Sequence, residues 1–175
     1  MSAYYFMQNI LRSLVMYKIA QSDFLRGEMM DLVGRIINAV TNIHPWHSMV
    51  VHFPIGLTGA ALLFILLALW RRNESLEHAA FFALALAAAS TVVAGMTGVR
   101  DNLVRFEGGA PYIPIKIFLA VTLLVLTTVT ALSRWRQKEL LWKPTTTVLY
   151  LAAFVGSFGL ASVLGFLGGV ILYGF

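Results

Sequence analysis

Long uncharged apolar runs dominate the chain and predict membrane-spanning helices. No Asp, Glu, Lys or Arg occurs from Met49 to Trp70, from Ala79 to Val99 or after Pro144, and a further run is interrupted only by Lys116 near its start. A helix crosses the hydrocarbon core of a bilayer with about 20 apolar residues. We therefore expect residues 44–175 to form one transmembrane domain, with four spans at about 49–70, 79–99, 113–133 and 145–170.

Residues 1–43 carry a different pattern, in which apolar and polar positions follow a helical period. Apolar side chains recur at three- and four-residue spacing from Leu25 to Val40, and charged side chains such as Arg26 and Asp31 occupy the other face. Such a helix can lie in the headgroup plane of a membrane or dock on a neighbouring subunit, and the pattern leaves both open. We expect an N-terminal amphipathic helical arm, with a second, more apolar helix within residues 4–19. A secretory signal is not expected, because the segment lacks the order of a basic start, an apolar block and a cleavage site.

Composition agrees with a membrane protein. Apolar residues make up 59% and charged residues 12% of the 175 residues, whereas a soluble domain carries about 25% charged residues. Cysteine is absent, which excludes disulfides and thiolate metal sites. The net charge of +5 comes from basic residues at the ends of apolar runs, so we expect membrane lipids and no nucleic acid as partners. The predicted fold class is an all-α membrane protein, a four-transmembrane-helix bundle with an N-terminal amphipathic arm.

The basic residues also predict an orientation. The connections after the first and third spans hold more Lys and Arg than the opposite side does, and the side richer in short-loop Lys and Arg faces the cytoplasm. The first group is Arg71, Arg72, Arg134, Arg136, Lys138 and Lys143, and the second is Arg35, Arg100, Arg105 and Lys116. We expect a multi-pass protein of a bacterial inner membrane with both termini on the periplasmic side.

Candidate site chemistry is concentrated at the head of the first span, where His44, His47 and His52 occur. On an ideal helix His47 and His52 point about 140° apart, so they do not clamp one cofactor between them. Asp101, at the end of the second span, returns to the same membrane face, where a carboxylate beside an imidazole fixes its tautomer. Met96 lies at nearly the depth of His52, and a His–Met pair is a known haem ligation.

Three interpretations of this cluster stay open. The histidines can be interfacial side chains that bond Asp101 or the loop backbone. They can bind haem b, a quinone or pigment headgroup, or a metal, with His47, His52, Met96 and Asp101 as cofactor contacts and His44, His47 and His52 as metal ligands. They can also belong to a proton or substrate route, because ionisable groups at membrane depth are usually functional.

The segment from His44 to Leu57 resembles the signature of an uncharacterised family of four-span bacterial membrane proteins. Members carry a His-Pro-x-His-Pro-Met-x-Val-His-Phe-Pro motif at the head of the first span, and Ser48 replaces the second proline here. The Gly98-Val-Arg-Asp101 element matches the family's Gly-x-x-Asp at the end of the second span. The resemblance implies a four-helix bundle, often beside or fused to Rieske or cytochrome domains, and no established reaction. Many members carry a histidine in the third span, and this chain has none there.

The sequence predicts a class of function and no specific reaction. No nucleophile elbow, phosphate loop or zinc-protease motif occurs, so an enzyme is not expected. We expect a small integral accessory subunit of a larger respiratory or photosynthetic electron-transfer complex, with a structural, scaffolding role among other membrane subunits. The alternative is a stand-alone protein that binds haem b, a quinone or pigment, or a metal at its outer-face histidines.

Overall fold

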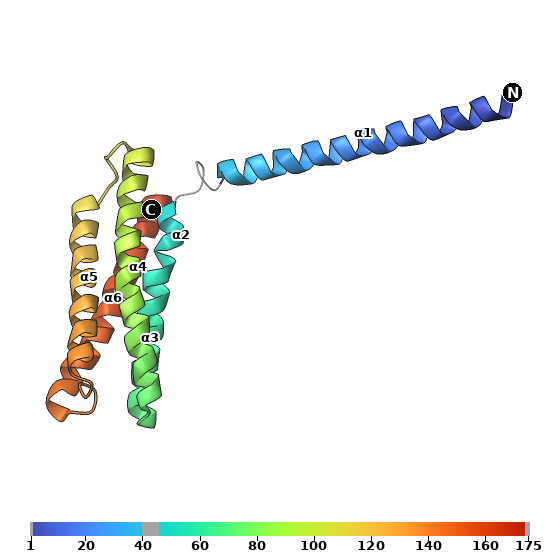
Figure 1. Cartoon of the computed structure of the whole chain (residues 1–175). Helices are drawn as coiled ribbons and strands as arrows, with labels where there is room; N and C mark the ends of the chain where they lie inside the picture. The colour runs from blue at the N-terminus through green and yellow to red at the C-terminus, as the bar shows by residue number, and fades with distance from the viewer. Residues whose placement is uncertain (1, 40–45, 174–175) are drawn as a thin grey trace. The chain divides into compact units, whose positions relative to one another are not determined.

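The computed structural model describes residues 2–39 and 46–173, and every regular element in these ranges is helical. The chain divides into two compact units, Met1–His44 and Pro45–Phe175. The first holds a single continuous helix, α1 (Ser2–Asn38) (Figure 1). The expected second helix within residues 4–19 is therefore the first half of α1, because no Gly or Pro interrupts the helical pattern before Gly27.

The second unit is the expected all-α membrane bundle. Its helices are α2 (Trp46–Val50), α3 (His52–Arg71), α4 (Glu74–Phe106), α5 (Ile113–Arg136) and α6 (Pro144–Tyr173). Four segments in the described ranges are long and apolar enough to cross a membrane, and α2 and α3 together form the first of them, Trp46–Arg71. The predicted four-span fold is confirmed.

Pro54 accounts for the division between α2 and α3. A proline inside a helix lacks the N–H that would bond the carbonyl four residues earlier, and its ring clashes with that carbonyl. The helix is interrupted at Val51, three residues before Pro54, and resumes at His52. Main-chain bonds from Val51 N to His47 O (3.0 Å) and from Ile55 N to Val51 O (3.3 Å) carry the span across the break. Pro54 thus lies in the first turn of α3, where a missing N–H costs little.

α4 extends beyond its predicted limits of 79 and 99 at both ends. Asn73 caps its first turn by accepting the N–H groups of Ser75 (2.9 Å) and Leu76 (3.2 Å). At the other end α4 continues through charged residues to Phe106. The predicted limits are set by the first ionisable residue on each side of the apolar run. The ends of a helix are instead set by its backbone hydrogen bonds and capping groups, which can lie beyond those residues.

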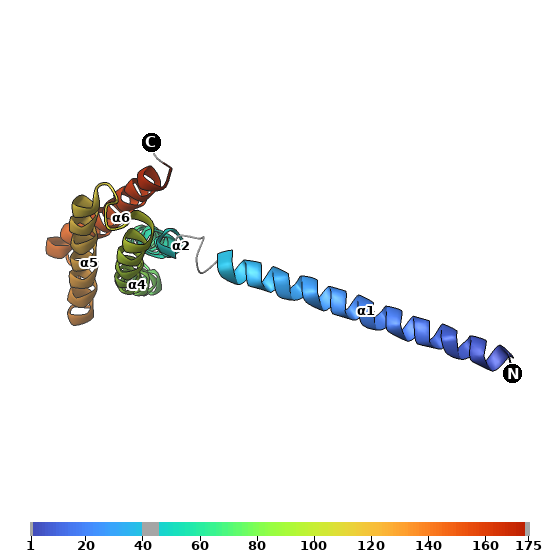
Figure 2. The same ribbon diagram turned by 90° about the horizontal axis from the view of Figure 1, so that it is seen from above.

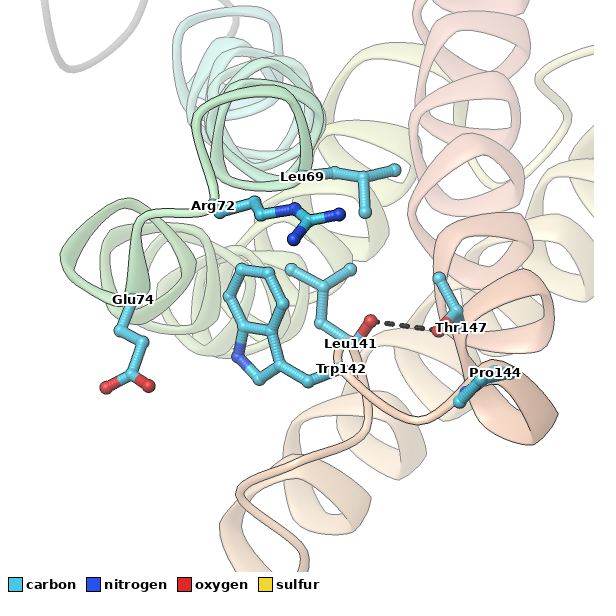
Figure 3. A pocket seen from close by; sticks show the side chains of 7 residues that line it. All are labelled: Leu69, Arg72, Glu74, Leu141, Trp142, Pro144 and Thr147. Carbon is cyan, nitrogen blue, oxygen red and sulfur yellow. Dashed lines mark hydrogen bonds between the residues drawn. The ribbon is translucent and has the colours of Figure 1, made fainter.

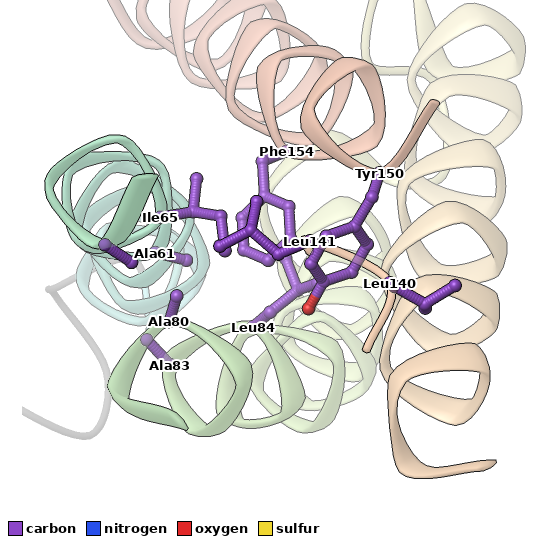
Figure 4. Packing of buried hydrophobic residues seen from close by; sticks show 10 residues of the cluster. Ala61, Ile65, Ala80, Ala83, Leu84, Leu140, Leu141, Tyr150 and Phe154 are labelled. Atoms are coloured by element: carbon purple, nitrogen blue, oxygen red, sulfur yellow. The ribbon is translucent and has the colours of Figure 1, made fainter. Parts of the chain in front are cut away.

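The spans form a ring in which α4 and α6 each pack on both α3 and α5, and α6 crosses its neighbours obliquely (Figure 1, Figure 2). Small side chains let α3 and α4 approach closely, as Figure 4 shows for Ala61, Ala80 and Ala83. The α5–α6 connection and α6 complete this core with larger side chains, Leu140, Leu141, Tyr150 and Phe154. The core lies at the end of the bundle where the α3–α4 and α5–α6 connections meet, and the histidine segment begins at the other end.

Candidate functional site

His47 lies against α4 and is held there through its ring. Its Nδ1 is 2.9 Å from the carbonyl oxygen of Ala94, and the Thr97 hydroxyl lies 3.5 Å from the same nitrogen. A carbonyl oxygen only accepts hydrogen bonds, so Nδ1 carries the proton and donates it. In the neutral ring Nε2 is then the acceptor position, which is the nitrogen available to a metal or a proton.

Gly98 makes this approach of α2 to α4 possible. The His47 ring covers Gly98 so closely that a β-carbon there would lie 3.0 Å from Cε1 and 3.1 Å from Nδ1. Both ends of the Gly-x-x-Asp element therefore have a structural role. Gly98 leaves room for the His47 ring, and Asp101 binds the main chain beside it.

Asp101 binds the backbone of the histidine segment and not its imidazole. Its Oδ2 accepts the N–H of His47 at 2.9 Å, and its Oδ1 accepts from Arg100 Nη1 at 3.0 Å. The carboxylate is buried and caps the first turn of α2 from another helix, where a negative charge is favoured. The Arg100 guanidinium also lies 5.7 Å from the centre of the Trp46 ring, which joins the start of α2 to the end of α4 a second time.

The remaining predicted site residues lie apart from this arrangement. His52 is exposed, and its Nδ1 bonds the carbonyl of Ser48 at 2.6 Å within the same helical turn. Met96 is 69% exposed on the outer surface of α4, whereas His47 is partly buried against it. His44 falls outside the described residues. Among residues that the structure does describe, no three His, Asp or Glu side chains gather as a metal site would require.

The site as it stands offers one imidazole of fixed orientation, and a carboxylate that holds the main chain of that imidazole in place. A carbonyl-oriented histidine is the usual form of a metal ligand, because the second bond fixes the ring and its tautomer. The same arrangement serves equally to hold α2 on α4, since each hydrogen bond joins the two elements.

A second polar cluster at the opposite end of the bundle was not predicted. Arg134, in the last turn of α5, donates through Nε and Nη2 to the two carboxylate oxygens of Glu77 in the first turn of α4. The hydroxyl of Tyr150, on α6, donates to Glu77 Oε1 at 3.4 Å. The Glu77 residue is 1% and the Arg134 residue 5% exposed, so this is a buried ion pair linking three helices.

A sequence signal for this cluster exists in the register of α4. Glu77 lies three residues before Ala80 and seven before Leu84, on the stripe that α4 buries. A carboxylate on the buried stripe of a span requires a partner of opposite charge. Arg134 was counted among the basic residues of a loop, so its inward position was missed.

The comparisons with known proteins agree with this architecture. Searches of curated proteins and of solved structures each gave no match. A model of one protein family, however, matches residues 43–175, which include the histidine segment and all four spans. The chain therefore belongs to the family described as "Predicted membrane protein (DUF2231)".

Proposed function

We propose that this chain is a small accessory subunit of a larger electron-transfer complex in a bacterial inner membrane, where it has a structural role. The histidine end and the arm face the periplasm in this proposal. The surplus of Lys and Arg after α3 and α5 supports that orientation, because those connections belong on the cytoplasmic side. The link to electron transfer rests on the family resemblance, whose members often occur with Rieske or cytochrome domains.

The observation that carries the subunit proposal is the apolar row on α1. Leu25, Met29, Leu32 and Ile36 recur at spacings of four, three and four residues and are 53–60% exposed. This spacing is the one that forms a packing seam between helices. In its own unit α1 has no second described helix to bury the row. A solitary helix is marginal in water, so the row is expected to be buried, and in this proposal a partner subunit buries it.

A second candidate function is cofactor binding at His47, alone or within the complex. The bond from Nδ1 to Ala94 O favours it, because that bond directs the lone pair of the neutral ring to Nε2. Haem b, a quinone or pigment headgroup, and a metal are the groups that one imidazole can serve. Neither His52, which is exposed, nor the lipid-facing Met96 supplies the opposing ligand, so a second chain would have to provide it.

One extraction experiment tests both candidates. Membranes are solubilised in mild detergent, and the particle that holds the chain is sized and its reduced-minus-oxidised spectrum recorded. We expect a large redox-active particle that the variant Met29→Glu/Leu32→Glu leaves, because two charges interrupt the apolar row. The matched control Glu28→Gln/Asp31→Asn, on the polar face of the same turns, should stay in the particle.

The outcomes separate the candidates. A particle of only one or two copies of the 19.3 kDa chain would contradict the subunit proposal. If that small particle shows a haem or metal signal that His47→Ala abolishes and His52→Ala retains, the second candidate replaces it. If neither variant changes the spectrum, His47 is a structural contact between α2 and α4.

A further inference from the structure

A pocket opens at the end of the bundle that holds the Glu77–Arg134 pair, and neither residue of that pair lines it. It measures about 440 Å³ and lies between the end of α3, the start of α4, the α5–α6 connection and the first turn of α6 (Figure 3). Side-chain hydrogen bonds hold the α5–α6 connection against the first turn of α6 at this pocket. The hydroxyls of Thr146 and Thr147 donate to the carbonyls of Leu140 (2.7 Å) and Leu141 (2.9 Å). These bonds fix the backbone that forms one side of the pocket.

The lining combines an apolar part with one cation. Leu69, Leu141 and the Trp142 ring supply the apolar part, and Arg72 supplies the cation. Figure 3 shows the Arg72 guanidinium beside Leu69 and above Leu141 and Trp142. A guanidinium is the side chain best suited to bind phosphate oxygens, because its N–H groups form a planar fork.

The charge balance around the pocket favours an anion. Among the described residues Arg72 has no ion-pair partner, whereas the nearby Lys143 is paired with Glu139 at 3.0 Å. Glu74 also lines the pocket, but its carboxylate points away from the guanidinium. Arg71, the preceding residue, stacks over Trp70 at 5.7 Å and does not line the pocket, so Arg72 is the cation of this site.

The depth of the pocket is that of lipid headgroups. Trp70 and Trp135, at the ends of α3 and α5, are 76% and 73% exposed, and Trp142 lies in the pocket itself. Tryptophan gathers at the membrane–water interface, where its indole lies at headgroup level. Arg72 lies two residues beyond Trp70 and is therefore placed where phosphates of the bilayer lie.

The backbone at Arg72 gives a further reason to assign the side chain a role. Arg72 has φ = 50° and ends α3 in the left-handed conformation, which favours Gly or Asn. An arginine here is strained, so the local backbone does not account for its presence.

We propose that this pocket binds the phosphate of an anionic phospholipid of the phosphatidylglycerol type. Arg72 bonds the phosphate oxygens, the Trp142 ring packs on the glycerol region, and Leu69 and Leu141 contact the start of an acyl chain. The site fixes one lipid between α3, α4, the α5–α6 connection and α6, and so joins the α3–α4 turn to that connection.

Native mass spectrometry of the full chain tests this site. The protein is released from micelles that contain equal amounts of phosphatidylglycerol and phosphatidylcholine with identical acyl chains, and the retained lipid is identified. We expect phosphatidylglycerol to be retained in preference, and the preference to fall about tenfold or more in Arg72→Asn, since a charge-assisted bond is lost. Asn accepts the left-handed backbone, so this variant keeps the turn.

Arg71→Asn is the matched control, because it removes the same charge from the adjacent position that stacks on Trp70 and does not line the pocket. It should retain phosphatidylglycerol as the parent chain does, and Arg72→Lys should retain it in part. Equal loss in Arg71→Asn and Arg72→Asn, or equal retention of the two lipids by the parent chain, would overturn the proposal. Retention of inorganic phosphate without phosphatidylglycerol would assign the site to free phosphate and overturn the lipid assignment.

Discussion

Glu77 and Arg134 place two charges in the interior of a membrane bundle, where the surroundings stabilise them only as a pair. Each desolvated charge costs several kcal/mol, which the partner's charge and hydrogen bonds must offset. The planar guanidinium meets both carboxylate oxygens, and Tyr150 donates to one of them. The three groups belong to three helices, so they set the relative positions of α4, α5 and α6.

Removal of one partner should therefore destabilise the bundle strongly. We expect Glu77→Gln to lower the free energy of unfolding by about 3–5 kcal/mol, because Arg134 is left as an uncompensated buried charge. The control Glu139→Gln, which breaks the exposed pair with Lys143, should cost about 1 kcal/mol or less. Denaturant titration of the purified protein in detergent measures both.

The apolar double replacement Glu77→Met/Arg134→Met separates the cost of one unpaired buried charge from the contribution of the ion pair itself. It should be closer to the parent chain than either single variant, since no buried charge remains. If Glu77→Gln and Glu139→Gln cost the same, the pair at the α4–α5 contact is solvated and contributes no more than a surface pair.

Sequence could predict the elements far better than their contacts. The apolar runs predicted the four spans because length and hydropathy alone decide whether a helix crosses a bilayer. Glu77 and Arg134 lie more than fifty positions apart, each within a turn of a helix end. Their charges looked interfacial in sequence, and only the packing of α4 on α5 turns them inward.

The histidine segment shows the same limit within one element. Its motif was visible in sequence, and so was the proximity of Asp101 expected from antiparallel spans. Which atoms meet was not visible, since Asp101 binds the His47 main chain and the His47 ring binds Ala94. These partners depend on the rotation of α4 about its axis, which the apolar pattern of a span leaves undefined because lipid and protein surroundings are both apolar.

The contact of α2 with α4 can be tested at Gly98. We expect Gly98→Ala to be less stable than Gly95→Ala by about 1–3 kcal/mol, because the new β-carbon meets the His47 ring at 3.0 Å. That ring cannot move freely, since Ala94 O and the Asp101 carboxylate hold the residue at two points. Gly95 meets nothing within 4 Å, so Ala should be tolerated there and should favour the helix.

Removal of the ring should remove the penalty. In the background His47→Ala, the variants Gly98→Ala and Gly95→Ala should have similar stabilities, and the double-mutant cycle gives the coupling energy between positions 47 and 98. A cycle with no coupling would mean that the His47 ring is not packed on α4, and it would remove the support for a fixed Nε2.

At the scale of the whole molecule, four spans place the α3–α4 and α5–α6 connections on one side of the membrane and the α4–α5 connection on the other. The pocket beside Arg72 is lined by residues of the α3–α4 and α5–α6 connections, which agrees with their lying on the same side. The basic residues are more numerous on that side, which predicts that it is cytoplasmic. The core packing near Leu140 and Leu141 also lies at this end of the bundle.

Single cysteines can check the sidedness cleanly, because the chain contains none of its own. Ser75, in the first turn of α4, and Gly109, in the α4–α5 connection, are both exposed and suit labelling better than the partly buried Ser48.

In intact bacterial cells with a permeable outer membrane, a membrane-impermeant maleimide should label Gly109→Cys at once. It should label Ser75→Cys only after lysis, because the surplus of Lys and Arg predicts that the Arg71–Arg72 connection faces the cytoplasm. Ser22→Cys, on the arm, should behave as Gly109→Cys does, since α1 precedes the first span. Labelling of Ser75→Cys and Gly109→Cys from the same side would contradict the four-span topology, and a reversed pattern would keep the topology and invert its orientation.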